Sequence, residues 1–148
     1  MAKLVKNTKG GGTLKSIIVS LAVDDCEAAL QYYKGIFGGV IKNTQKADNV
    51  EMFKGHEGKY IHSELHINEY CILYLTDIFS SKHTEGNNFQ IVLELDSEDE
   101  IINQYEALAK DGNIKFPLGD TFWGAKHGVV TDKYGITWGL NYTHANIR

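Results

Sequence analysis

Hydrophobic residues in the first half of the chain follow two different spacings. The run from Ile17 to Val23 is short, aliphatic and partly β-branched, which is typical of a strand. From Cys26 to Phe37 the apolar positions follow helical spacing, whereas Ile61 to Ile67 alternates with polar residues at period two. The same patterns predict three further segments: a strand that begins at Val40, a polar loop over 43–58 and a partner strand over 71–75.

The second half repeats this order of elements. Residues 89–95 form a strand pattern, and a helix follows over 97–111 behind the capping pair Ser97 and Glu100. The next strand, 114–118, carries the only proline of the chain, which predicts an edge strand or a bulge. A terminal hairpin completes the pattern, with strands over 126–131 and 136–142 and a turn over 132–135.

An offset of about 73 residues aligns the two halves. It places Ile18 on Ile91, Val19 on Val92, Tyr32 on Tyr105, Gly39 on Gly112 and Ile41 on Ile114. We therefore predict an α+β fold of two βαβββ repeats that form a half-open mixed-sheet barrel, whose concave interior is a natural ligand site. The predicted segments within this one domain are a flexible tail (1–14), a first unit (15–78), a linker (79–87), a second unit (88–143) and a C-terminal tail (144–148).

Composition and charge narrow the classes of partner. The 148 residues are 43% hydrophobic and 23% charged, which indicates a globular chain. The net charge of −4 and the lack of a basic stripe argue against nucleic acid, and no apolar run is long enough to span a membrane. Because the lysines of the first residues run into glycines rather than an apolar segment, we expect no signal peptide and a cytoplasmic location, with Cys26 and Cys71 as free buried thiols.

Several motifs resemble one protein family. They are Ala28 to Tyr33 with Phe37-Gly38-Gly39, Ile61 to Leu65, Thr121-Phe122-Trp123-Gly124, and Val130 to Trp138. In this order and spacing they resemble PhnB-like proteins of the vicinal-oxygen-chelate (glyoxalase/bleomycin resistance/dioxygenase) superfamily, and the resemblance covers about Ser16 to Tyr142. Members are often labelled 3-demethylubiquinone-9 3-methyltransferases. However, the first strand enters its helix through Asp24-Asp25-Cys26, without the glycine-rich turn that usually holds S-adenosylmethionine.

The resemblance implies a paired βαβββ barrel, often a homodimer, in which many enzymes hold a divalent metal in the concavity. The implied metal-ligand positions fall near Ile18, near Phe89 or Gln90, and near Gly139. None of these is a histidine or carboxylate, so we predict that the usual metal triad is absent. A one-residue slip in the alignment would change each assignment.

The pattern His62-x-Glu64-x-His66 is the best local alternative for a metal, because all three side chains point to one face of a strand. The outer pair is about 13 Å apart at Cα, which strains a single Zn²⁺ site, and a solvated polar face is the simpler interpretation. His62 also coincides with a family motif, so we interpret it as a polar group that lines the pocket.

The aromatic candidates have two interpretations. Trp123 and Trp138 either pack in the core or form an aromatic wall of the concavity, and Tyr74 has the same ambiguity. Asp132 and Gly135 are assigned to the hairpin turn, and His127 to the pocket mouth or the surface.

These observations lead to a hypothesis of a protein that binds an unidentified small molecule in the barrel. The candidate pocket residues are His62, Glu64, Tyr74, Gln90, Trp123 and Trp138. No catalytic residue is assigned, and whether the protein is an enzyme stays open. The alternative is a metal-dependent lyase, isomerase or dioxygenase that uses His62 and Glu64 with a ligand from the other half, such as Gln90 or His127.

Overall fold

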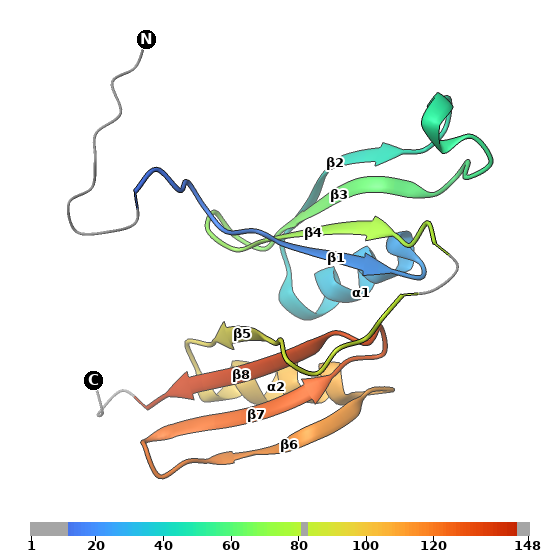
Figure 1. Cartoon of the computed structure of the whole chain (residues 1–148). Helices are drawn as coiled ribbons and strands as arrows, with labels where there is room; N and C mark the ends of the chain where they lie inside the picture. Colours follow the sequence, from blue (N-terminus) through green and yellow to red (C-terminus); the bar gives the residue numbers. More distant parts are fainter. Residues whose placement is uncertain (1–11, 81–82, 145–148) are drawn as a thin grey trace.

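Two consecutive βαβββ units make up the chain, as the hydrophobic pattern predicts (Figure 1). The structure is a computed structural model that describes residues 12–80 and 83–144, so most of the predicted tails lies outside the described residues. The first unit contains β1 (Val19–Val23), α1 (Cys26–Phe37), β2 (Val40–Lys46), the 3-10 helix η1 (Glu51–Phe53), β3 (Tyr60–His66) and β4 (Ile72–Asp77). The second contains β5 (Ile91–Glu94), α2 (Glu98–Ala109), β6 (Asn113–Asp120), β7 (Ala125–Thr131) and β8 (Thr137–Thr143).

Each unit forms one four-stranded mixed sheet. The strand order is β1-β4-β3-β2 in the first sheet and β5-β8-β7-β6 in the second. The first strand of each unit pairs in parallel with the last strand, and the other pairs are antiparallel. The predicted α+β fold of two βαβββ repeats is confirmed, and the barrel is not closed.

Each sheet has one face covered by helix and one face left open. In the first sheet Leu65, Leu73 and Leu75 are buried beneath α1, and alternation sends the intervening side chains to the opposite face. In Figure 1 the helix of each unit lies behind the strands of its sheet, so the two uncovered faces are turned to the same side. The uncovered faces carry Ser20, His62, Glu64, His66 and Tyr74 in the first sheet and Gln90, Val92, Val129 and Asn141 in the second.

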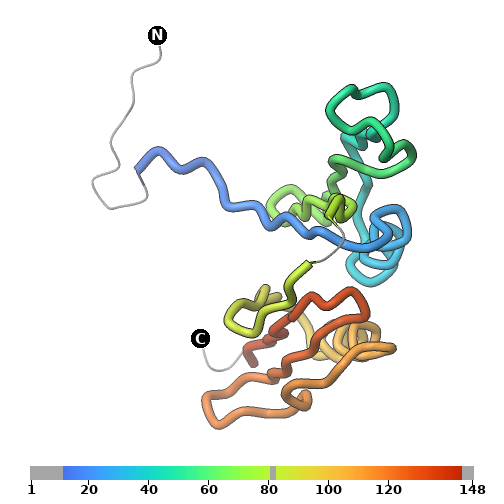
Figure 2. The backbone as a smooth tube through the Cα atoms, turned by 45° about the vertical axis from the view of Figure 1, so that its right-hand side comes forward, coloured from blue at the N-terminus to red at the C-terminus, as the bar shows by residue number. Residues whose placement is uncertain are grey.

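The two units meet through α1. Its Tyr33 is fully buried and donates a hydrogen bond of 2.5 Å from its hydroxyl to Asp132 Oδ2 in the turn between β7 and β8. The Nε1 of Trp138 donates to the same oxygen at 2.8 Å. Figure 2 shows the two units one above the other, with the chain passing once between them.

Glycines confirm the internal repeat. A Cβ at Gly39 would lie 2.3 Å from the carbonyl oxygen of His66, and one at Gly112 would lie 2.4 Å from that of Thr131. These carbonyls end β3 and β7, which are the equivalent strands of the two sheets. Both glycines therefore fill the same place in their units, where the chain after the helix passes directly over a strand end.

Some predictions need correction. The predicted loop at 43–58 begins too early, because β2 continues to Lys46 across an irregularity that precedes Gln45. This strand lies at the sheet edge, where polar side chains are solvated, so hydrophobic patterning does not reveal it. Cys71 is exposed rather than buried, whereas Cys26 is buried as expected.

The predictions for the second unit hold more closely. β6 is an edge strand, and its pairing with β7 shifts register on both sides of Phe116, so the position of Pro117 is explained. The terminal hairpin turns over 132–135 as predicted. Among the described residues, neither helix is long and apolar enough to cross a membrane.

Candidate functional site

Two adjoining cavities lie where the segment 83–90 passes the second sheet. One has a volume of about 690 Å³ and is lined by residues of this segment, which include Gln90, and by strand residues that include Lys115 and Thr131. The other, of about 520 Å³, is bounded on one side by residues 17–22 of β1 and the segment before it. Both volumes fall within the range of small-molecule sites. The two cavities share five lining residues: Glu85, Gly86, Phe89, Gly135 and Thr137.

The wall of the smaller cavity contains residues of both units. The 520 Å³ cavity has Ile18 and Ser20 of the first unit on one side and Ile136 and Thr137 of the second on the other. In the 690 Å³ cavity, Thr131 and Thr137 are cross-strand partners whose hydroxyl oxygens lie 2.8 Å apart. Such hydroxyl and amide groups can donate and accept hydrogen bonds, and Glu85 and Lys115 add one side chain of each charge to the wall of the 690 Å³ cavity, so the site suits a polar ligand.

The structure locates the three positions at which the resemblance implies metal ligands. Ile18 and Phe89 line the 520 Å³ cavity, and Gln90 lines its neighbour. A Cβ added to Gly139 would lie only 2.5 Å from Oε1 of Gln90. The Gln90 amide therefore occupies the space into which a side chain at position 139 would project.

A second polar group lies on the uncovered face of the first sheet, around Glu64 of β3. Its Oε2 lies 2.7 Å from Nε2 of His62, and its Oε1 lies 2.7 Å from Nε2 of His66. The side-chain amide of Asn43 donates to Oε1 at 3.0 Å. Although no helix covers this face, Glu64 is only 9% exposed, because its own hydrogen-bond donors surround it.

These donors determine the charge state of Glu64. The hydrogen bonds from His62, then His66 and then Asn43 lower the pKa of this carboxyl group from its ordinary value of 4.5 to about 2, against the opposing effect of burial. Asn43 adopts a left-handed conformation with φ of 54°, at the irregularity of β2. Bulges often redirect a side chain, and here Asn43 is directed at the carboxylate.

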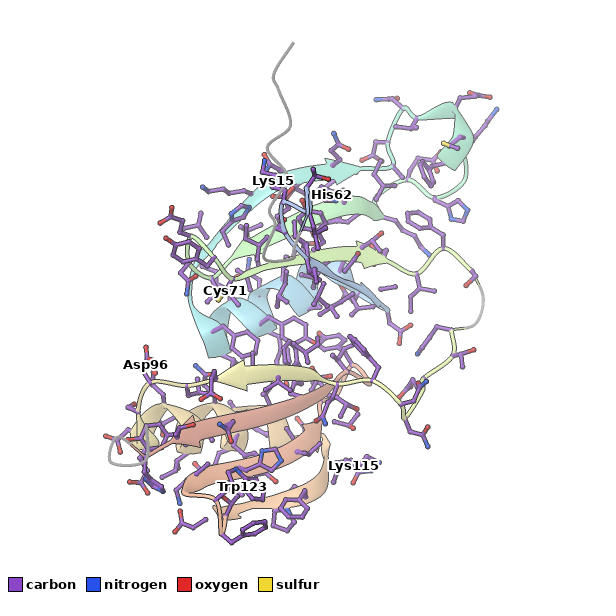
Figure 3. The ribbon with its side chains drawn as sticks, turned by 60° about the vertical axis from the view of Figure 1, so that its left-hand side comes forward. Lys15, His62, Cys71, Asp96, Lys115 and Trp123 are labelled. Carbon is purple, nitrogen blue, oxygen red and sulfur yellow. The ribbon has the colours of Figure 1, made fainter. Side chains whose placement is uncertain are left out.

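Tyr74 completes this group as its aromatic member. It lies directly across from Glu64 on β4, and its ring contacts His62 edge to face at a centroid distance of 4.7 Å. The structure thus brings together His62, Glu64 and Tyr74 of the predicted pocket residues. Figure 3 shows His62 on the first sheet, away from Lys115 on the second.

The arrangement of His62, Glu64 and His66 differs from a chelate. The two Nε2 atoms converge on separate oxygens of one carboxylate, so Glu64 occupies the space between the imidazoles. Within residues 12–80 and 83–144, no three His, Cys, Asp or Glu side chains are arranged to hold a metal ion.

The two tryptophans occupy different environments. Trp123 lies in the turn between β6 and β7, is 53% exposed, and contacts the rings of Phe122 and His127. Trp138 lies on the helix-covered face of β8 and is fully buried, so the core-packing interpretation applies to it and it does not join the pocket group. Its indole bond to Asp132 satisfies the one polar atom of that side chain.

Several site residues escape sequence analysis. Asn43 falls in the predicted loop and Lys115 belongs to no motif, whereas Thr131 and Thr137 lie within the motif from Val130 to Trp138 but are not among the candidate pocket residues. The period-two alternation of β7 places Thr131 on the same face as Val129. Only the pairing of β7 with β8 brings Thr137 beside Thr131.

Comparisons with known proteins agree with this architecture. A sequence model of the glyoxalase/bleomycin resistance protein/dioxygenase superfamily matches residues 15–140. An uncharacterised protein of Mycobacterium bovis is 28% identical over 128 residues, which cover 81% of this chain and 78% of that protein.

Two solved structures show the same fold over most of this chain. Protein PA1353 from Pseudomonas aeruginosa aligns with a TM-score of 0.77 and 27% identity, covering 88% of this chain and 98% of that one. A Bacillus cereus PhnB protein, described as a putative 3-demethylubiquinone-9 3-methyltransferase, aligns with a TM-score of 0.75 and 26% identity, covering 87% and 100%. The PhnB-like resemblance of the motifs is thereby confirmed, and the chain belongs to the glyoxalase/bleomycin resistance protein/dioxygenase superfamily.

Proposed function

We propose that this protein binds a small organic molecule on the concave side of the half-open barrel, without the metal triad of its superfamily. The observation that carries the proposal is the pair of adjoining cavities, of about 690 and 520 Å³, of which the second lies between the two units. Their walls combine apolar side chains with a few hydroxyl, amide and charged groups, the mixture that small-molecule sites use.

The residues at the triad positions support binding without that metal set. Ile18 has no donor atom, Gln90 offers only a neutral amide, and Gly139 has no side chain. Divalent metals in such sites take imidazole or carboxylate ligands, so these three residues do not fit the triad. The function is therefore recognition through shape and hydrogen bonds.

A thermal-shift screen of the full chain against metabolites and antibiotics tests the proposal. We expect at least one compound to raise the melting temperature in proportion to its concentration, because ligands that bind only the native state stabilise it. Thr137→Val removes a hydroxyl that lines both cavities and should weaken the shift. Thr143→Val, on the same strand but outside these cavities, is the matched control. A screen without any stabilising compound contradicts the proposal.

A metal-dependent lyase, isomerase or dioxygenase is the second candidate. It is favoured by the residue types, since His62 and Glu64 lie together on an uncovered face and both can bind divalent ions, but their direct 2.7 Å contact would have to open to admit an ion. Elemental analysis of protein purified without chelator distinguishes the two candidates. Metal at one equivalent per chain that is lost in Glu64→Gln supports the second candidate, and substoichiometric metal rejects it.

We further propose that the protein is a homodimer, which is common in the superfamily. Exposed aromatic residues of the second unit support this, since monomers rarely leave such groups in contact with water. Three of them are Phe116, Phe122 and Trp123. Light scattering at micromolar concentration should give twice the chain mass of 16.6 kDa, and a monomer mass contradicts the proposal. The cytoplasmic location also stays a prediction.

A further inference from the structure

The hydrogen bonds of Glu64 determine which nitrogen of each neighbouring imidazole carries a proton. An ionised carboxylate can only accept hydrogen bonds. Since Nε2 of His62 and Nε2 of His66 each lie 2.7 Å from a Glu64 oxygen, both Nε2 atoms must be the donors. In the neutral ring the other nitrogen, Nδ1, is then left as an acceptor.

The two acceptors differ in their surroundings. The side chain of His62 is 33% exposed, compared with 24% for His66. The ring of His62 is also held against Tyr74, so its orientation is fixed by Glu64 on one side and an aromatic ring on another. A partly exposed acceptor in a fixed orientation beside an aromatic surface is suited to recognise a planar molecule that carries a donor.

We propose that Nδ1 of His62 accepts a hydrogen bond from the O–H or N–H group of an aromatic ligand, and that Glu64 is the positioning residue that keeps this nitrogen an acceptor. His62 lines neither of the two cavities that carry the proposed function, so the inference goes beyond it and places an aromatic ligand on the uncovered face of the first sheet. It adds the chemical class of that ligand: a phenol, an enol or a ring N–H compound.

The proton positions can be measured without any ligand. Long-range ¹H–¹⁵N spectra of the full chain at alkaline pH should show Nε2 protonated and Nδ1 bare in both His62 and His66. In Glu64→Gln the amide has one oxygen and one NH₂ group, so it can accept from only one imidazole through its oxygen. We therefore expect the other imidazole to move its proton to Nδ1 or lose its hydrogen bond.

A variant outside this group provides the control for the spectra. Glu69→Gln, in the turn between β3 and β4, removes the same charge and should leave both imidazole signatures unchanged. Protonated Nδ1 in the wild-type His62 overturns the inference. So do signatures in Glu64→Gln that match the wild type, because Glu64 would then not set the proton positions.

A matched pair of probes tests the ligand class. By calorimetry, wild-type protein should bind β-naphthol about tenfold more tightly than its methyl ether, which lacks the donor but keeps the aromatic ring. His62→Phe keeps a ring at this position without an acceptor and should abolish the preference. His56→Phe, in the loop between β2 and β3, should keep it.

The outcomes separate this inference from the proposed function. A preference that survives in His62→Phe, or equal binding of both probes by the wild type, overturns the role of His62 while leaving small-molecule binding intact. If neither probe binds, the aromatic ligand class is rejected. The thermal-shift screen, which includes compounds of other classes, then decides the proposed function independently.

Discussion

At the scale of single residues, Glu64 stays charged on an uncovered sheet face, which makes the stability of the protein depend on pH. Its pKa is lowered to about 2 in the folded chain by His62, His66 and Asn43. A lowered pKa gives stability that is present above the ordinary value of 4.5 and is lost as the pH falls toward 2. Between these limits we expect the free energy of unfolding to fall more steeply in the wild type than in Glu64→Gln. Urea unfolding at a series of pH values measures this, and identical slopes would contradict it.

The two cysteines give a second prediction at this scale. Burial raises the pKa of the Cys26 thiol to about 11, with only partial opposition from its contact with Ser63, whereas Cys71 is exposed. Because the thiolate is the reactive form, a thiol reagent should modify one cysteine rapidly in the native protein and both in denaturant. Cys71→Ser should remove the rapid reaction and Cys26→Ser should leave it. Rapid modification in Cys71→Ser would show that Cys26 is accessible.

At the scale of elements, the glycines after the helices set how closely each helix and its next strand can approach the sheet. Gly39 has φ of 99° and lies against the carbonyl of His66, so Gly39→Ala should cost about 3 kcal/mol of unfolding free energy. Gly35 lies inside α1 with open space at its Cβ position. Gly35→Ala should therefore stabilise the protein by about 0.5–1 kcal/mol. Chemical denaturation measures the change in unfolding free energy of each variant. Changes of similar size and the same sign in the two variants would contradict the prediction.

Elements were predictable where burial imposes a regular pattern. Helix α1 has the predicted bounds, because Ala29, Leu30 and Tyr33 repeat on one buried face and Gly38 ends the helix. The edge strand β2 was only partly predictable, since its polar residues carry no periodic signal. Likewise, the offset of about 73 residues holds as far as Ile41 and Ile114 and then fails, because the connection between β2 and β3 is longer than that between β6 and β7.

At the scale of the whole molecule, the candidate site depends on contacts between distant segments. The resemblance indicated His62 through a motif and Gln90 through an implied ligand position, but only Gln90 lines a cavity. The cavities form where residues 83–90 pass β8 and, in the smaller cavity, β1. Trp138 also depends on contacts between distant segments, because the sequence pattern alone could not assign it to the core or to the pocket. Its position was decided by the packing of α1 from the other unit, with Tyr33 and Trp138 sharing Asp132.

This shared carboxylate connects the two units, and two adjacent tyrosines test it. Burial, and then Asp132, raise the pKa of Tyr33, so its hydroxyl stays protonated and donates to the carboxylate. Tyr33→Phe removes that donor from a buried charged acceptor and should cost about 1.5–3 kcal/mol of unfolding free energy. The neighbouring Tyr32 hydroxyl is buried without a hydrogen-bond partner among the described residues.

Tyr32→Phe is therefore the matched control for Tyr33→Phe. It should leave stability unchanged or raise it by about 1 kcal/mol, because a buried unpaired hydroxyl is a cost that phenylalanine avoids. Urea unfolding followed by tryptophan fluorescence measures both variants, since Trp138 lies against the Tyr33 ring. If the bond to Asp132 holds the units together, the lower unfolding free energy of Tyr33→Phe should appear in a single unfolding transition that includes both units. Equal stability of the two variants would mean that the units are joined by apolar packing alone.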